Sequence, residues 1–201
     1  MINYLFFGIV YSFACVVQPG PFQALLFSQS LTHGWQKTVP IVFAPIISDI
    51  PIVILVLVIL TNVPHLFLRI LQCVGGAFLL YLAYGAYKTW RTFHQDAGKK
   101  VTHQIKFYKA ILVNIFNPGP YLGWSLIMGP QLIKAWNDAP LNGIVLVFAF
   151  YATLVICSIA LIMLFATARN FGPAVSRMSI GFSVIAFAVF GIYQFWSGII
   201  R

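Results

Sequence analysis

The stretch Val17-Gln18-Pro19-Gly20-Pro21-Phe22 recurs in nearly the same form as Phe116-Asn117-Pro118-Gly119-Pro120-Tyr121. Each copy consists of an apolar residue, a side-chain amide, Pro-Gly-Pro and an aromatic residue. The two copies lie about half of the 201-residue chain apart. A repeat at this spacing predicts two related halves, each beginning with the segment that carries its copy.

The surroundings of both copies are apolar. Hydrophobic residues make up 61% of the chain and charged residues only 7%, whereas a soluble domain carries about a quarter charged residues. This composition excludes a soluble enzyme, a disordered tail and a nucleic-acid-binding domain. The net charge of +9 would suggest nucleic acid in a soluble protein, but here it indicates the cytoplasmic loops of a protein in a lipid bilayer.

Six segments have the length and hydrophobicity of a membrane crossing, which needs about 20 apolar residues. They are Tyr4–Leu31, Thr38–Leu60, Leu66–Tyr87, Tyr108–Ile133, Leu141–Ala168 and Met178–Ile200. Barrel strands would alternate polar and apolar residues, and these segments do not. No cleavable signal peptide is predicted, so the first segment should remain in the mature protein. The expected fold is an all-α integral membrane protein with six transmembrane helices, those carrying Pro-Gly-Pro being broken there.

The only strongly polar segment divides the chain into the two halves. We expect a first three-helix repeat over 1–87, a basic linker over 88–107 and a second three-helix repeat over 108–201. Because three crossings is an odd number, the halves should be inverted relative to each other, as in inverted-repeat transporters.

The distribution of Lys and Arg predicts the orientation. Nine of the 12 fall after the first, third and fifth crossings, and three fall on the other side. We therefore expect a multi-pass protein of the bacterial inner membrane, with the linker in the cytoplasm and both termini periplasmic or extracellular.

Pro-Gly-Pro inside a crossing predicts a broken helix. Proline has no N–H and its ring clashes with the preceding turn, and the carbonyls so released cannot face lipid. We expect Gln18–Pro21 and Asn117–Pro120 to be non-helical, close together and turned toward an interior site. Pro19 and Pro118 suit the first position of a new helix, and two such positive helix ends would hold an anionic group. The alternative is a pair of kinks that only shape packing.

Asp49 is the only acid well inside a predicted crossing. A charge at the bilayer centre costs about 2.5–3.5 kcal/mol on insertion scales and usually marks an ion or substrate pathway. We expect Asp49 to bind a cationic group and to carry the proton in coupled transport. The alternatives are that it caps a helix starting at Pro51 or bonds Ser48 or a nearby amide. An anion site beside one carboxylate favours a zwitterion, such as a free amino acid.

The candidate substrate-binding residues are those of the two breaks, Asp49, and an asparagine one turn before the second break. They are Gln18, Pro19, Gly20, Pro21, Asp49, Asn114, Asn117, Pro118, Gly119 and Pro120.

The three cysteines form no C-x-x-C pair and neither H-E-x-x-H nor G-x-S-x-G occurs, so no metal, no cofactor and no enzymatic activity is predicted. Gly75-Gly76 and the Gly119–Gly123 spacing predict close helix packing.

The chain resembles the LysE/RhtB family of amino-acid exporters over nearly its whole length. The resemblance rests on Pro19-Gly20-Pro21, Ser30–Trp35, Asp49, Gly75–Tyr84, Asn114–Pro118 and Gly129–Ile133. Phe22 and Gly119-Pro120 depart from the residues that the family often has there. The resemblance implies export of amino acids across the bacterial inner membrane, driven by the proton gradient.

The alternatives that stay open are a cation or metal exporter of the same fold and a non-transporting membrane scaffold. A related class of electron carriers with paired cysteines is disfavoured, since the counterpart of Cys15 in the second half is Asn114. The expected partners are an amino acid, protons and the bilayer, with no nucleic acid, and a homodimer is compatible with the sequence.

Overall fold

The computed structural model describes residues 1–18, 20–59, 65–92, 105–168 and 173–200, and all the regular structure in these ranges is helical. The elements are α1 (Ile2–Val17), α2 (Pro21–His33), α3 (Trp35–Val42), α4 (Ala44–Ile54), the π-helical segment η1 (Leu55–Ile59), α5 (His65–Thr92), α6 (Phe107–Ile115), α7 (Pro118–Gly123), the π-helical segment η2 (Trp124–Met128), α8 (Gly129–Asp138), α9 (Pro140–Ala168) and α10 (Pro173–Ile200). The middle of the predicted linker, 93–104, lies outside the described residues.

Four helical stretches among the described residues are long and apolar enough to cross a membrane. They are Trp35–Leu57, Arg69–Lys88, Pro140–Thr167 and Gly181–Ile200, and the pair α1 and α2, bent by 67°, would be a fifth. The predicted crossing Tyr108–Ile133 is not among them, because the chain there is divided into α6, α7, η2 and α8. The structure thus gives an all-helical membrane protein with four or five candidate spans, and the count of six stays a prediction.

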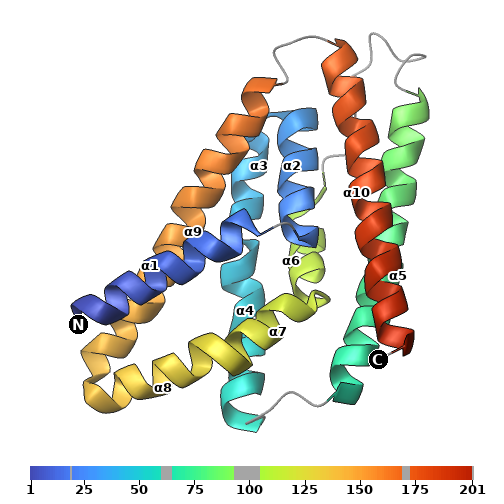
Figure 1. Ribbon diagram of the computed structural model, residues 1–201. Helices are drawn as coiled ribbons and strands as arrows, with labels where there is room; N and C mark the ends of the chain where they lie inside the picture. Colours follow the sequence, from blue (N-terminus) through green and yellow to red (C-terminus); the bar gives the residue numbers. More distant parts are fainter. Residues whose placement is uncertain (19, 60–64, 93–104, 169–172, 201) are drawn as a thin grey trace.

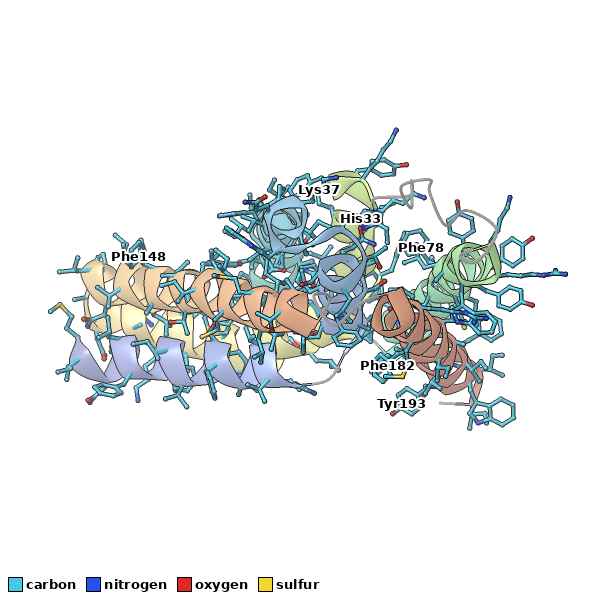
Figure 2. All side chains as sticks on the ribbon, turned by 90° about the horizontal axis from the view of Figure 1, so that it is seen from above. His33, Lys37, Phe78, Phe148, Phe182 and Tyr193 are labelled. Carbon is cyan, nitrogen blue, oxygen red and sulfur yellow. The ribbon has the colours of Figure 1, made fainter. Side chains whose placement is uncertain are left out.

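Two outer groups of helices flank a central set (Figure 1). The tilted helices α1 and α8 pack on α9 on one side, and α5 and α10 run along each other on the other side. Between the groups stand α2, α3, α4 and α6, and both termini lie toward the lower end of the view. Seen from above, α5 and α10 lie at the opposite end of the molecule from Phe148 on α9 (Figure 2).

Glycines bring α5 and α10 into close contact, as the sequence predicted for Gly75-Gly76. A Cβ on Gly76 would lie 2.6 Å from the backbone nitrogen of Phe195, and one on Gly198 would lie 2.6 Å from Cys73 Sγ. Gly34 has another role, since its φ of 83° is favoured in glycine alone and turns the chain between α2 and α3. The α5–α10 pair is therefore a tightly packed unit.

Candidate functional site

The first Pro-Gly-Pro copy breaks the chain between α1 and α2. Gln18 ends α1 with extended backbone at ψ 125°, and Gly20 is also extended, at φ −161° and ψ 174°. Both residues precede a proline, which disfavours the helical conformation at the position before it. The new helix begins at Pro21 rather than at Pro19, so the predicted start was wrong by two residues. Pro19 itself lies outside the described residues.

The second copy behaves differently, because its amide side chain is one carbon shorter. Asn117 Oδ1 accepts a hydrogen bond from Gly119 N at 3.1 Å and caps α7, which starts at Pro118 as predicted. The bond holds Gly119 in the helix although a proline follows it. Within Asn117–Pro120 only Asn117 is non-helical, at ψ 124°, so the prediction of a non-helical stretch was wrong for Pro118–Pro120.

Two glutamine side chains each satisfy a carbonyl that a proline leaves without a partner. In continuous helices the carbonyls of Cys15 and Phe116 would accept from residues 19 and 120, and both are prolines. Gln23 Nε2 donates to Cys15 O at 3.0 Å, and Gln194 Nε2 of α10 donates to Phe116 O at 2.9 Å. These two carbonyls are thus bonded within the protein rather than turned toward lipid, as the sequence predicted.

Asp49 lies in the middle of α4 with only 4% of its surface exposed. Asn114 Nδ2 donates to its Oδ1 at 2.8 Å and to Ser48 Oγ at 2.7 Å, and the Tyr151 hydroxyl donates to Oδ2 at 3.0 Å. Since α4 runs unbroken from Ala44 to Ile54, Asp49 does not cap a helix at Pro51, and that alternative was wrong. A bond to a nearby amide, the other alternative, is present.

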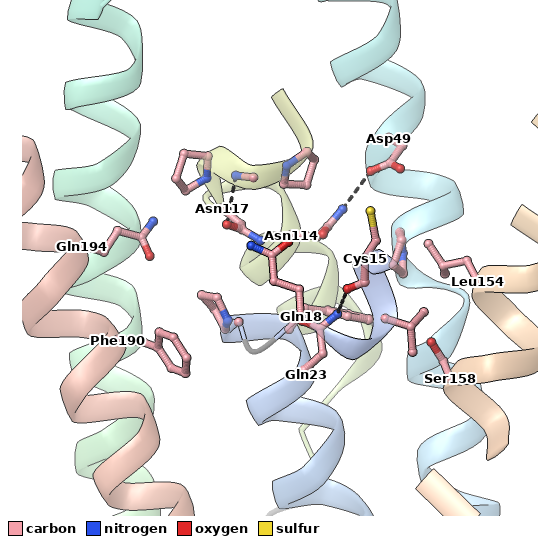
Figure 3. A pocket seen from close by; sticks show the side chains of 18 of the residues that line it. Cys15, Gln18, Gln23, Asp49, Asn114, Asn117, Leu154, Ser158, Phe190 and Gln194 are labelled. Atoms are coloured by element: carbon pink, nitrogen blue, oxygen red, sulfur yellow. Dashed lines mark hydrogen bonds between the residues drawn. The ribbon is translucent and has the colours of Figure 1, made fainter. Parts of the chain in front are cut away.

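The two breaks and Asp49 face one cavity of about 310 Å³ (Figure 3). This volume is sufficient for one small molecule. The predicted site residues that line the cavity are Gln18, Gly20, Pro21, Asp49, Asn114, Asn117, Pro118, Gly119 and Pro120. Segments from both halves of the chain, about half its length apart in sequence, therefore contribute to a single site.

A protein-family model, the LysE type translocator, matches residues 13–195. The chain belongs to the LysE type translocators. None of the curated proteins and none of the solved structures matches it. The matched range includes both Pro-Gly-Pro copies and every residue named around Asp49, so most of the cavity lining lies in the part of the chain that matches this family of membrane transporters.

The two helix starts of this translocator offer different backbone donors to the cavity. In α2 the first helical bond runs from Ala24 N to Gly20 O at 2.9 Å, and no side chain caps the helix. The N–H groups of Phe22 and Gln23 therefore have no partner among the described residues, and both residues line the cavity. In α7 two of the first three residues are prolines, and Asn117 occupies the remaining N–H, that of Gly119. The sequence predicted two equivalent anion-binding ends, but at these two helix starts the N–H groups without a partner among the described residues are those of α2.

Several polar residues of the translocator's site were not predicted from the sequence, and four of them make or offer side-chain hydrogen bonds there. The Tyr151 hydroxyl donates to Asp49. Gln23 and Gln194 donate to backbone carbonyls at the two breaks, and Gln72 of α5 lines the cavity. An amide in an apolar segment is a usable signal for the three glutamines. No comparable signal in the sequence marked Tyr151. The repeat pairs Asp49 with Phe148 instead, and Phe148 is 72% exposed and points outward from α9 (Figure 2).

Proposed function

We propose that this translocator exports amino acids or similar small zwitterions across the bacterial inner membrane in exchange for protons. The observation that carries the proposal is one cavity lined both by a buried carboxyl group, Asp49, and by Phe22 and Gln23 at the start of α2, whose N–H groups have no partner among the described residues. A free amino acid has one group that matches each of them. Membership of a translocator family supports transport rather than catalysis.

Recognition would place the two charged ends of the substrate on different partners. The α-carboxylate would accept from Phe22 N and Gln23 N, where the α2 dipole is positive. The α-ammonium would donate to Asp49, beside the bonds from Asn114 and Tyr151. A charged group buried without a partner costs far more than one that is paired, so both contacts are needed to bring a zwitterion into the membrane.

Proton exchange would use the same carboxyl group. Ammonium and proton compete for Asp49, so loading one releases the other, which is the requirement for antiport at a single site. The Tyr151 hydroxyl is 3.0 Å from Oδ2, and a hydroxyl can donate or accept. Tyr151 would donate to the ionised form and accept from the protonated form, which keeps the side chain in place in both states.

Transport by everted membrane vesicles tests this function directly. Vesicles that contain the chain should take up radiolabelled amino acids when their interior is acidified, and collapsing the pH gradient with a protonophore should stop net uptake. Vesicles without the chain provide the background. Uptake that is unaffected by the protonophore would contradict proton coupling, and no uptake of any amino acid would contradict the proposal as a whole.

We also propose a membrane topology for this function. The chain would cross the membrane six times in two inverted halves, with both termini periplasmic. An alkaline phosphatase fused after Arg201 should be active in a bacterial host, because the enzyme folds only outside the cytoplasm. A fusion within 93–104 should be inactive for the same reason. The reverse result, an active linker fusion with an inactive C-terminal fusion, would exclude this topology.

A further inference from the structure

One wall of the cavity comes from α5 and α10. Its polar groups are Gln72 of α5 and Gln194 and Ser197 of α10, with Phe190 and Tyr193 beside them. In Figure 3, Gln194 and Phe190 lie on one side of the two breaks, and Asp49 and Ser158 lie on the other. The α5–α10 wall is therefore separate from the groups assigned to the ammonium and the carboxylate.

The amides of this wall retain hydrogen-bonding capacity toward the cavity. Gln72 is half-buried, and none of the described residues bonds its side chain. Gln194 is 6% exposed and uses Nε2 for the carbonyl of Phe116, which leaves Oε1 as an acceptor. Buried amides left unpaired cost stability, so an occupant that bonds them is favoured over one that does not.

The wall also has no charge of its own. Among the described residues that line the cavity, Asp49 is the only acidic residue, and none is lysine, arginine or histidine. Asp138 bonds Tyr4 and does not line the cavity. A second ammonium or carboxylate on the substrate would therefore lose water without meeting an opposite charge.

We propose that Gln72 and Gln194 select the side chain of the exported amino acid, and that the substrate carries an uncharged side chain with a hydroxyl or amide group. The inference rests on the proposed function, since the α-ammonium and α-carboxylate must first occupy Asp49 and the start of α2. A glutamine amide both donates and accepts, so it pairs with a hydroxyl or another amide. An aliphatic side chain leaves it unpaired, and a charged one is penalised.

This selectivity can be measured as uptake into everted vesicles that contain the unmodified chain. The probes are L-serine, L-glutamine, L-leucine, L-lysine and L-glutamate. Serine or glutamine should be taken up at least about tenfold more efficiently than the other three. Lysine, glutamate or leucine transported equally well would overturn the inference but leave the proposed function standing. Uptake of none of the five would defeat the proposed function together with the inference.

A charge placed on the wall provides the complementary test. Gln72→Glu should raise lysine uptake, relative to serine, by at least about tenfold, because the new carboxylate supplies the missing partner. Gln131→Glu is the matched control: it adds the same group on α8, beside Lys134 and outside the cavity, and should leave the ratio unchanged. An unchanged ratio in Gln72→Glu, or an equal shift in both variants, would show that Gln72 does not contact the substrate side chain.

A binding measurement separates recognition from transport. With Cys73→Ala and Cys157→Ala, Cys15 is the only cysteine left, and it is half-buried in the cavity wall. Serine or glutamine should slow its alkylation by N-ethylmaleimide at least about tenfold more effectively than lysine. Equal protection by lysine would contradict the selection proposed for Gln72 and Gln194.

Discussion

Asp49→Asn should abolish export driven by a pH gradient while the protein remains folded and inserted. The asparagine keeps the size of the side chain and an oxygen that accepts from Asn114 Nδ2, the bond that is now 2.8 Å long. In the unmodified protein the Tyr151 hydroxyl donates to Asp49 at 3.0 Å. In the variant the amide nitrogen can instead donate to that hydroxyl. The variant loses the carboxyl group and its negative charge, and the proposed exchange requires both. Uptake into everted vesicles with an acidic interior measures the effect.

Two variants control this prediction. Asp49→Glu should retain partial export, since it keeps a carboxyl group but displaces it by one carbon. Asp138→Asn should export like the unmodified chain, because Asp138 lies at the end of α8, bonded to Tyr4 and outside the cavity. Export at the unmodified rate by Asp49→Asn, with the same dependence on the gradient, would show that Asp49 is structural and that another group couples the proton.

Gly75→Ala should strongly destabilise the protein. A Cβ at this position would lie 2.3 Å from Phe116 O and 2.4 Å from Gln194 Nε2. The carbonyl belongs to the backbone at the second break and cannot rotate away, so α5 would have to move off α6. Overpacking of this kind costs about 1–3 kcal/mol, and loss of the bond between Gln194 and Phe116 adds about 0.5–1.5 kcal/mol. The midpoint of thermal unfolding in detergent should fall accordingly.

Gly85→Ala is the matched control on the same helix. A Cβ there meets no atom within 4 Å, and alanine is favoured over glycine in a helix by about 1 kcal/mol. Its unfolding midpoint should be unchanged or higher. If Gly75→Ala melts at the temperature of the unmodified protein, α5 does not approach the second break as closely as the structure shows.

Much of the fold could be predicted from local properties of the chain. A composition with 7% charged residues excludes a soluble fold, since such a chain could not cover its surface with polar groups. Proline lacks an N–H wherever it occurs, so the two Pro-Gly-Pro copies predict altered helices without reference to any other segment. The cost of a buried carboxyl group likewise singles out Asp49 from its position in an apolar run.

The differences between the two copies depend on finer local geometry. Asn117 reaches the N–H of Gly119, whereas Gln18 ends α1 in extended backbone and makes no such cap. Asparagine is a better N-cap than glutamine, but this preference alone did not show that capping would leave Pro118–Pro120 helical. It also did not show that α7 would then have no N–H free for an anion.

The sequence by itself therefore determined the membrane class, the two places where the helices are interrupted and the presence of one carboxyl group, Asp49, within an apolar segment, because each follows from the chemistry of neighbouring residues. Only the tertiary structure decided which distant groups meet them. Tyr151 reaches Asp49 from α9, Gln194 reaches Phe116 from α10, and Gln72 faces the same cavity from α5. These contacts depend on how helices far apart in the sequence pack and rotate against one another, and the order of residues along a single apolar helix does not specify that.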